Sequence, residues 1–429
     1  MYDLAIIGAG WAGFNASLKA RQLGLKVVLI DQALLGGTCL NLGCIPTKSL
    51  IQSAKIFNLA RKAPDFGINV SGSAVDFLKV QERKDRIIQQ LRSGMQQMLK
   101  DIDYLTGQAR LVSNQEIRVS EKNIQARNIL LATGSKPYEL APFKFDAEKF
   151  LSSNEMISLK EIPASLLIIG GGVIGCEFAG LFSSFGTKVT IAEKMAQLIP
   201  GEDREAAKKL ETVFKKKGIK VNTNCDAAIL DPADFGLVLV CVGRKAQTEN
   251  LGLEELGINS TKGRIVTDDY LKTNISNIYA AGDCTAKIML AHFAAYQGIS
   301  AVHNLAHPDN QEPAIARCVP SCIFTDPEIA SVGLSEEQAI SSGEKVAIHK
   351  FDFLASGMAR ILGETEGFIK IVSAEKSGVV LGAVIIGPRA TELIGIFTLA
   401  VARQLNIKDL RETIFAHPTL SESITEAIK

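Results

Sequence analysis

Two glycine-rich turns, each placed directly after an apolar run, constrain the fold of this chain more than any other feature. Residues 4–13 read Leu-Ala-Ile-Ile-Gly-Ala-Gly-Trp-Ala-Gly, and residues 166–175 read Leu-Leu-Ile-Ile-Gly-Gly-Gly-Val-Ile-Gly. A strand that runs through G-x-G-x-x-G into a helix is the fingerprint of a dinucleotide-binding βαβ unit. A single turn of this kind carries little weight, but two complete units predict two Rossmann-like folds in one chain.

Each unit also has an acidic residue at the end of its second strand, Asp31 in the first and Glu193 in the second, at the same spacing from the first glycine. The spacing is close to the roughly 20 residues expected for an acid that binds a ribose hydroxyl. Glu193 favours NAD because a carboxylate repels the extra phosphate of NADP, although Lys194 beside it weakens this signal. The expected dinucleotide contacts are Gly8, Gly10, Gly13 and Asp31 in the first unit, and Gly170, Gly172, Val173, Gly175 and Glu193 in the second.

Two cysteines, Cys39 and Cys44, lie within the glycine-rich segment 36–48, soon after the first unit begins. Their spacing is about one helical turn, so the two thiols could form a disulfide without movement of distant backbone. Such a small loop adds little stability, which favours a redox role over a structural one. A zinc site would need four ligands, and no second cysteine pair stands nearby. Buried free thiols remain a reasonable interpretation for Cys176, Cys225 and Cys241.

Composition narrows the function classes. A chain of 429 residues is long enough for two to four domains. The net charge of +1, from 47 basic and 46 acidic residues, gives no preference for nucleic acid or an anionic membrane. No apolar run reaches transmembrane length, and residues 1–8 read as a strand rather than a signal peptide. Eight cysteines without such a signal predict a reducing, cytoplasmic location.

Further elements can be placed from hydropathy and turn residues. Residues 79–100 are typical of an amphipathic helix. Buried strands are expected over residues 128–135, 237–244 and 278–283, each closing on a glycine turn or an acid. From about Pro320 the pattern changes to strands within residues 365–386, followed by a helix over roughly 388–405.

Taken together, these motifs resemble the disulfide-containing pyridine nucleotide–FAD oxidoreductases, and within them the dihydrolipoamide dehydrogenases most closely. The resemblance covers nearly the whole chain. It implies an α/β protein with two Rossmann-like nucleotide-binding domains and a C-terminal α+β dimerisation domain. The segments that carry it are Gly8–Gly13, Cys39–Lys48, Ala132–Gly134, Gly170–Glu177, Ala280–Asp283, Phe324–Glu328 and His417–Glu422.

The resemblance implies that the first unit binds FAD and that the second binds NAD. Cys44 would be the thiolate that faces the flavin, and Cys39 the thiol that exchanges with substrate sulfur. Lys48 would lie near the flavin, paired with Glu177, where a cation stabilises the reduced anion. The other implied cofactor contacts are Gly37, Thr38, Gly107, Thr133, Gly134, Asp283 and Ala291 for FAD, and Gly243 in the nicotinamide domain.

His417 resembles the catalytic base of the family, with Glu422 placed to orient its imidazole. In this family the histidine serves the active site of the opposite subunit, so a homodimer is implied. Protein-bound dihydrolipoamide would then be oxidised through the Cys39–Cys44 disulfide and FAD, with reduction of NAD to NADH. The implied partner is a lipoyl-bearing acyltransferase or carrier protein of a 2-oxoacid dehydrogenase or glycine cleavage complex; no metal is expected.

Two other functions stay open at this stage. An NADPH-dependent disulfide reductase of the glutathione reductase type is disfavoured by Glu193 and by the segments 45–48 and 416–422. A subunit that holds FAD only as a scaffold would have no need for the set of two cysteines with His417 and Glu422.

The expected domain boundaries follow the resemblance, with two departures from it. Residues 222–234 are short for the family, which predicts a reduced nicotinamide domain, and residues 244–248 lack the usual proline and asparagine. Cys318 and Cys322 form a second closely spaced pair, with three residues between them, but lack flanking glycines and a lysine, which predicts structural thiols. The expected segments are 1–145 for FAD, 146–263 for NAD, 264–316 to complete the FAD domain, and 317–429 for the interface.

Overall fold

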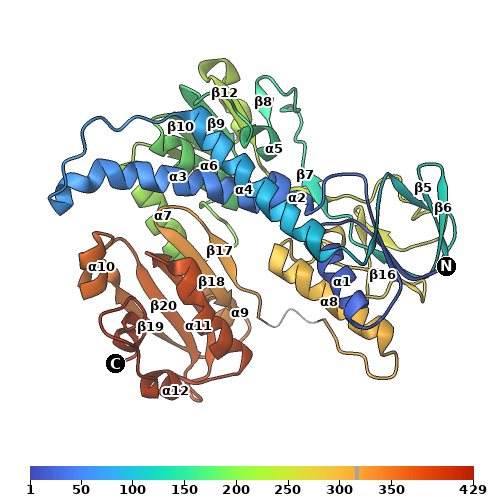
Figure 1. Ribbon diagram of the computed structural model, residues 1–429. Helices are drawn as coiled ribbons and strands as arrows, with labels where there is room; N and C mark the ends of the chain where they lie inside the picture. The colour runs from blue at the N-terminus through green and yellow to red at the C-terminus, as the bar shows by residue number, and fades with distance from the viewer. Residues whose placement is uncertain (315–317) are drawn as a thin grey trace.

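The computed structural model describes residues 1–314 and 318–429 and arranges them around three large sheets (Figure 1). The first sheet has the order β3-β2-β1-β6-β5-β4, with β16 also paired to β6. Strands β1, β2, β3 and β16 pair in parallel, whereas β4 and β5 pair antiparallel. Its strands are β1 (Tyr2–Ile7), β2 (Val27–Asp31), β3 (Asp103–Thr106), β4 (Ala109–Leu111), β5 (Glu116–Val119), β6 (Lys122–Leu131) and β16 (Ile278–Ala280).

Two helices lie side by side on one face of the first sheet, α1 (Trp11–Gln22) and α8 (Ala291–Ala306) (Figure 1). Helices and loops cover the parallel strands on both faces. Consecutive residues of β1, Leu4–Ile7, are therefore all apolar and buried, and apolar and polar residues do not alternate there. A short 3₁₀ segment, η4 (Gly282–Thr285), joins β16 to the start of α8.

The second sheet is parallel, with the order β11-β10-β9-β12-β8. It repeats the strand–helix–strand pattern of the first unit. Its elements are β8 (Phe150–Leu151), α5 (Ser153–Met156), β9 (Ser165–Ile169), α6 (Val173–Ser184), β10 (Lys188–Ala192), α7 (Arg204–Lys216), β11 (Lys220–Asn222), η2 (Ala227–Ile229), η3 (Pro232–Asp234) and β12 (Leu237–Val240).

The C-terminal sheet is antiparallel, with the order β17-β18-β21-β20-β19, and helix α11 packs across β18 and β21 (Figure 1). This part therefore differs from the two parallel units, as the change of sequence pattern from about Pro320 predicts. The elements are β17 (Ser321–Ile323), β18 (Glu328–Gly333), α9 (Glu336–Ser341), β19 (Val346–Asp352), η5 (Phe353–Ala355), α10 (Gly357–Leu362), β20 (Phe368–Ala374), β21 (Val380–Gly387), α11 (Ala390–Ala402), α12 (Ile407–Glu412) and α13 (Ser423–Ala427).

A helical insertion separates β2 from β3 in the first unit. It consists of α2 (Gly37–Leu42), α3 (Cys44–Lys62), η1 (Ala63–Phe66) and α4 (Phe77–Met98), with α3 packed along α4 (Figure 1). Helix α4 begins where Asp76 accepts a hydrogen bond from the Lys79 amide, which places its start slightly before the predicted residue 79.

Short strands connect the first two units. Strand β7 (Ser135–Pro137) pairs antiparallel with β13 (Arg244–Ala246), and a small hairpin comes next, β14 (Ser260–Thr261) with β15 (Arg264–Ile265). The strand predicted over residues 237–244 is therefore two strands, because the chain turns at Gly243, whose φ is 128°. The domain boundaries stay predictions, and the one between residues 316 and 317 lies outside the described residues.

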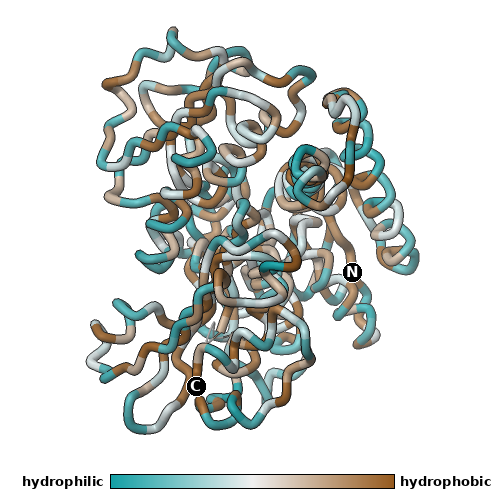
Figure 2. The backbone as a smooth tube through the Cα atoms, turned by 90° about the vertical axis from the view of Figure 1, so that its left-hand side faces the viewer, coloured by the Kyte–Doolittle hydropathy of each residue, from teal (hydrophilic) through white to brown (hydrophobic). Residues whose placement is uncertain are grey.

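The predicted fold class, with two nucleotide units and a C-terminal α+β part, is confirmed. Hydrophilic and hydrophobic residues are interspersed along the chain (Figure 2). Among the helices of residues 1–314 and 318–429, none is both long enough and apolar enough to cross a membrane.

Candidate active site

The first glycine turn packs against neighbouring backbone too closely for a side chain at Gly8 or Gly13. Gly8 has φ 109°, and a Cβ there would lie 2.1 Å from the carbonyl oxygen of Ala132. A Cβ on Gly13 would lie 1.8 Å from the Gly8 oxygen, so α1 can approach the turn only with glycine at this position. Gly10 is the N-cap of α1 and has no side-chain cap, which leaves the first amides of the helix available to an anion.

The carboxylate of Asp31 supports this turn. Its Oδ2 accepts a hydrogen bond from the Ala9 amide at 2.6 Å, and its Oδ1 accepts one from the Ala33 amide at 2.8 Å. Burial raises the pKa of Asp31, and the backbone amides partly offset this. The residue at the end of β2 is thus held beside the turn, where a ribose hydroxyl can reach it.

A cavity of about 650 Å³ extends along this edge of the first sheet. This volume lies within the usual range for cofactor sites. The hydroxyl oxygen of Thr133 is buried and has no partner in the described residues, so it is available to a ligand. The predicted FAD residues that line the cavity are Gly8, Gly10, Asp31, Gly37, Thr38, Gly107, Thr133 and Gly134.

These residues fit a dinucleotide such as FAD, because they combine a glycine cradle, free helix amides and an acid. Four predicted FAD residues are not among the lining residues: Gly13, Lys48, Asp283 and Ala291. Gly13 packs beneath the turn, Ala291 begins α8, and Asp283 accepts a hydrogen bond from the Ser135 hydroxyl at 2.6 Å.

The second cavity, of about 770 Å³, lies over the second glycine turn. The Oε2 atom of Glu193 accepts a hydrogen bond from the Gly171 amide at 2.6 Å, as Asp31 does from Ala9. Gly175 packs under the turn, where a Cβ would lie 2.0 Å from the Gly170 oxygen. The predicted nicotinamide-nucleotide residues that line this cavity are Gly170, Gly172, Val173, Glu193 and Gly243.

The two predicted redox cysteines lie on different helices, so their expected placement on one helical turn is wrong. Cys39 belongs to α2 and Cys44 begins α3, because Gly43 breaks the helix with φ −142° and ψ −109°. Both are half-buried free thiols. Helix α2 also provides Gly37 and Thr38 to the first cavity, so the cysteine pair adjoins the predicted FAD site.

The two thiols differ in acidity. A hydrogen bond from Cys39 lowers the pKa of Cys44 to about 7, an effect that burial opposes and the nearby Lys48 ammonium reinforces. The same hydrogen bond raises the pKa of Cys39 well above its usual value. Cys44 is also the first residue of α3, a position that favours a thiolate. Above a pH of about 7 the pair therefore holds one thiol, Cys39, and one thiolate, Cys44.

Lys48 and Glu177 meet as predicted. The Lys48 Nζ atom lies 2.8 Å and 2.7 Å from the two carboxylate oxygens of Glu177, which is almost fully buried in α6. The pair thus joins the helical insertion of the first unit to the second unit. Both charges act on Cys44: Lys48 lowers its pKa and Glu177 raises it.

Phe324, at the end of β17, completes this pair from the C-terminal part. Its amide donates to the Oε1 atom of Glu177 at 3.0 Å, and the Lys48 Nζ atom lies 4.8 Å from the centre of its ring. Sequence reasoning used Phe324 only as part of a family segment. No local pattern marks such a contact, because it joins residues far apart in the chain.

Arg244 is a second residue that sequence reasoning missed. Its Nε atom donates to the Ser135 hydroxyl, and its Nη2 atom donates to the Ser135 carbonyl, each at 2.8 Å. Ser135 in turn binds Asp283. Burial lowers the pKa of Arg244, and the charges of Asp283 and Cys44 oppose this. Arg244 therefore links the second unit to the predicted FAD residue Asp283, in the segment that departs from the family pattern.

His417 and Glu422 form the predicted pair in the C-terminal tail. The Nδ1 atom of His417 lies 2.9 Å from the Glu422 Oε2 atom, and the imidazole side chain is 82% exposed. Within residues 1–314 and 318–429, His417 has no hydrogen bond to Cys39 or Cys44. One subunit therefore presents the pair outward, with the Nε2 atom free.

The sequence predicts Cys318 and Cys322 to be structural thiols, and both contact helix α11. Cys318 and Cys322 donate to different carbonyls of α11, those of Thr398 at 3.3 Å and Thr391 at 3.9 Å. Burial raises the pKa of both thiols. In the part of the chain that the structure describes, no group of three or more His, Cys, Asp or Glu residues is arranged to hold a metal ion.

Comparisons with known proteins agree with this geometry. Residues 2–298 match the model of the pyridine nucleotide-disulphide oxidoreductases, and residues 319–428 match the dimerisation domain of that family. A dihydrolipoyl dehydrogenase of Chlamydia muridarum is 40% identical over 448 residues, covering 99% of this chain and 96% of the relative. One from Bacillus subtilis is 38% identical over 460 residues, covering 99% and 97%.

Two solved structures have the same fold. LpdA from Mycobacterium tuberculosis gives a TM-score of 0.91 at 28% identity and covers 99% of this chain and 98% of its own. The HOCl-induced flavoprotein disulfide reductase RclA from Escherichia coli gives 0.89 at 30% identity, covering 100% and 99%. The predictions of an FAD-dependent oxidoreductase that uses NAD, and of a dimerisation domain, are thereby confirmed. The chain belongs to the pyridine nucleotide-disulphide oxidoreductase family.

Proposed function

We propose that this protein is a dihydrolipoyl dehydrogenase, which oxidises dihydrolipoyl groups and reduces NAD. The observation that carries the proposal is the cysteine pair itself: a thiol and a low-pKa thiolate that adjoin the first cavity, beside an ion pair shared with the second unit. The full-length similarity to curated dihydrolipoyl dehydrogenases supports it.

FAD in the first cavity and NAD in the second supply, when bound, the two-electron chemistry that reoxidises the cysteine pair. The residues of the chain carry the thiol chemistry. A substrate thiolate attacks Cys39 in the oxidised pair, which breaks the Cys39–Cys44 bond and releases Cys44 as thiolate. The second substrate sulfur then attacks the mixed disulfide and releases Cys39, so that the substrate leaves as a cyclic disulfide and the pair is reduced by two electrons.

Cys44 suits the part of leaving group. In this step Cys39 is bonded to sulfur and donates no proton, so the start of helix α3 and the nearby Lys48 charge are what stabilise the departing Cys44 anion. Cys39 has a raised pKa and accepts the proton at the end of the exchange.

His417 is proposed as the base that removes the substrate proton. Glu422 holds its Nδ1 atom, which leaves Nε2 to accept a proton. Because the side chain points into solvent in one subunit, we propose that it serves the cysteine pair of a second subunit in a homodimer. The dithiol substrate would arrive on a lipoyl-bearing acyltransferase or carrier protein of a 2-oxoacid dehydrogenase or glycine cleavage complex.

The second candidate is an NADPH-dependent disulfide reductase, which the similarity to RclA favours weakly. Glu193 argues against it, because its carboxylate lines the second cavity at the position that would meet the extra phosphate of NADPH.

Anaerobic reduction by dihydrolipoamide tests the proposal. The flavin of the FAD-loaded protein is expected to be reduced within the mixing time of a manual experiment. The flavin of the Cys39→Ser variant is expected to remain oxidised. Cys318→Ser, a cysteine that binds only a helix carbonyl, is the matched control and should behave as the unmodified protein. Equal reduction of Cys39→Ser would contradict the role of Cys39.

Subunit mixing tests the shared site. Neither Cys39→Ser nor His417→Gln homodimers should turn over dihydrolipoamide at an appreciable rate. If His417 serves the opposite subunit, a mixed dimer of the two variants holds one complete site and regains activity. If both residues served the same subunit, the mixed dimer would stay inactive.

A further inference from the structure

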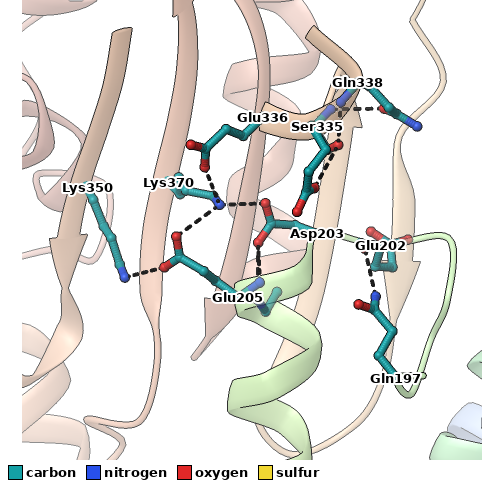
Figure 3. A network of polar contacts seen from close by, with 11 residues as sticks. Gln197, Glu202, Asp203, Glu205, Ser335, Glu336, Gln338, Lys350 and Lys370 are labelled. Atoms are coloured by element: carbon teal, nitrogen blue, oxygen red, sulfur yellow. Dashed lines mark hydrogen bonds and ion pairs between the residues drawn. The ribbon is translucent and has the colours of Figure 1, made fainter. Parts of the chain in front are cut away.

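A buried lysine joins the C-terminal sheet to the second nucleotide unit. Lys370 lies in β20 with 2% of its side chain exposed, and its Nζ atom is 2.6 Å from the Oδ2 atom of Asp203, itself 2% exposed. Glu336 and Glu205 add carboxylate oxygens at 3.2 Å and 3.3 Å, as Figure 3 shows. Lys350 approaches Glu205 from β19 at 2.6 Å.

This cluster, made of Lys370 with Asp203, Glu205 and Glu336, is a costly way to join two domains. Burial lowers the pKa of Lys370, but the three carboxylates outweigh it and the pKa is raised overall, so the ammonium stays charged. Apolar side chains of similar volume would hold two surfaces together at least as well as a buried ion pair does. The cluster is therefore better explained by a requirement for defined geometry than by a requirement for stability.

Asp203 connects the cluster to helix α7. It is the N-cap of α7: its Oδ1 atom accepts hydrogen bonds from the Glu205 amide at 2.9 Å and the Ala206 amide at 3.1 Å. Its other oxygen binds Lys370 (Figure 3). A single carboxylate thus fixes both the start of α7 and its position against β20.

Residues 194–202, the loop directly before Asp203, form one wall of the second cavity. Lys194, Met195 and Pro200 line that cavity. At its start the loop is held by the Met195 amide, which donates to the Glu193 Oε1 atom at 2.7 Å. In its middle the Ile199 amide donates to the Gly171 carbonyl at 2.7 Å. The wall is therefore tied to the glycine turn that receives the nucleotide.

The end of the loop is held by the C-terminal part instead. The Ser321 hydroxyl of β17 donates to the Glu202 Oε1 atom at 2.9 Å, next to the contact between Asp203 and Lys370. Both anchors of this end therefore come from the sheet that belongs to the dimerisation domain.

We propose that Lys370 is a positioning residue for the nicotinamide-nucleotide site: from the dimerisation domain it fixes the end of loop 194–202 and thereby the wall of the second cavity. The inference rests on the proposed function in that this cavity takes NAD(H). It predicts that nucleotide affinity depends on a residue that does not line the cavity.

Titration of NADH into FAD-loaded, full-length dimer tests this. Lys370→Met is expected to weaken NADH binding, and to raise the KM for NAD, by about tenfold, a change typical of a residue that couples two sites. The KM for dihydrolipoamide and kcat at saturating NAD should stay within about twofold, because the cysteine pair is untouched.

The matched control is Lys209→Met. Lys209 lies on α7 and pairs across the same interface with Glu366, but in the described part of the chain it has no ion pair with Asp203 or with loop 194–202. NADH affinity should stay within about twofold of the unmodified protein. An equal loss in Lys209→Met would show that any weakened docking of α7 suffices, and would overturn the role of Lys370.

A second variant guards against a folding defect in Lys370→Met. Asp203→Asn keeps a side-chain oxygen for the helix cap but removes the charge that Lys370 binds, so it should weaken NADH binding to a similar extent. Hydrogen exchange on the unmodified protein is independent of any variant: NADH should slow exchange at the amides of Ser335 and Gln338, beside Glu336.

The outcomes separate the two proposals. An unmodified protein that fails to bind NADH contradicts the proposed function. Normal NADH affinity in both Lys370→Met and Asp203→Asn, or unchanged exchange at residues 335–338, overturns the role of Lys370 alone.

Discussion

The two nucleotide units are nearly the same at their glycine turns and differ in the segments inserted after their second strands. The first glycine has φ 109° in Gly8 and 107° in Gly170. Gly10 and Gly172 cap their helices with the same angles, φ −73° and ψ −170°, and each helix is 12 residues long. At the first glycine sterics enforce this agreement, because φ is positive and a Cβ would lie 2.1 Å from a backbone oxygen at Gly8 and 2.6 Å from one at Gly170. The turn therefore predicts a dinucleotide but not which one.

The difference lies in the insertions. After β2 the first unit inserts α2, α3 and α4; these helices carry Cys39, Cys44 and Lys48, and α2 also contributes Gly37 and Thr38 to the first cavity. After β10 the second unit has only loop 194–202 and α7, and its chemistry is limited to Glu193 and the cavity walls. Reactive groups are thus provided by the inserted helices, while the shared framework holds cofactors.

Matched substitutions at the third glycine should separate the two units most clearly. Valine at Gly13 or Gly175 would force side-chain atoms against a carbonyl oxygen that a Cβ already meets at 1.8 Å or 2.0 Å. We expect Gly13→Val to lose FAD, and Gly175→Val to keep FAD but bind NADH at least a hundredfold more weakly, about 3 kcal/mol. Flavin absorbance and NADH titration measure the two losses; loss of FAD from Gly175→Val would contradict the assignment.

The acids at the strand ends should give the next largest effect. Glu193→Gln removes the charge that repels NADP, so the ratio of kcat/KM for NAD over NADP should fall by about tenfold. Asp31→Asn is the matched change in the first unit and should leave that ratio unchanged while weakening FAD. A change of nucleotide preference in Asp31→Asn would mean that the cavities are assigned the wrong way round.

The Lys48–Glu177 pair connects the units with opposite effects on Cys44. Lys48 lowers the pKa of Cys44 and Glu177 raises it, and the thiolate forms only above that pKa of about 7. Lys48→Met should therefore slow alkylation of reduced Cys44 by iodoacetamide at pH 7 by about fivefold, and Glu177→Gln should not slow it. Rates measured across pH 5–9 would contradict this if both variants shifted the profile upward.

Phe324 should have the smallest effect. Phe324→Leu removes the ring over Lys48 but keeps the amide bound to Glu177, so the alkylation profile of Cys44 should move by only about twofold in rate at pH 7. Phe324→Tyr keeps the ring and should match the unmodified protein. Equal behaviour of the leucine and tyrosine variants would show that the ring has no effect on Cys44.

The sequence predicts those parts of the molecule that local sterics decide. Both glycine turns, the acids at the strand ends and the helix at residues 77–98 follow from short-range patterns. The pairing of Lys48 with Glu177 is available through family resemblance alone, since the two residues are far apart in the chain. Residue patterns give no such information about contacts between domains.

The misses have two origins, one local and one between domains. The spacing of Cys39 and Cys44 predicts one helical turn, but Gly43 breaks the helix between them, and that glycine is the available signal. Phe324, Arg244 and Lys370 act through partners on other domains, so no spacing within their own segments could identify them.

We propose that the first unit carries the thiol chemistry and that the second unit selects NAD. Turnover of dihydrolipoamide by the FAD-loaded protein with NAD or with NADP is the most direct test of this division. The cysteine pair beside the first cavity and Glu193 in the second predict oxidation of dihydrolipoamide, with kcat/KM about a hundredfold higher for NAD. Equal or faster turnover with NADP, or NADPH-dependent reduction of glutathione disulfide without any activity on dihydrolipoamide, would contradict it.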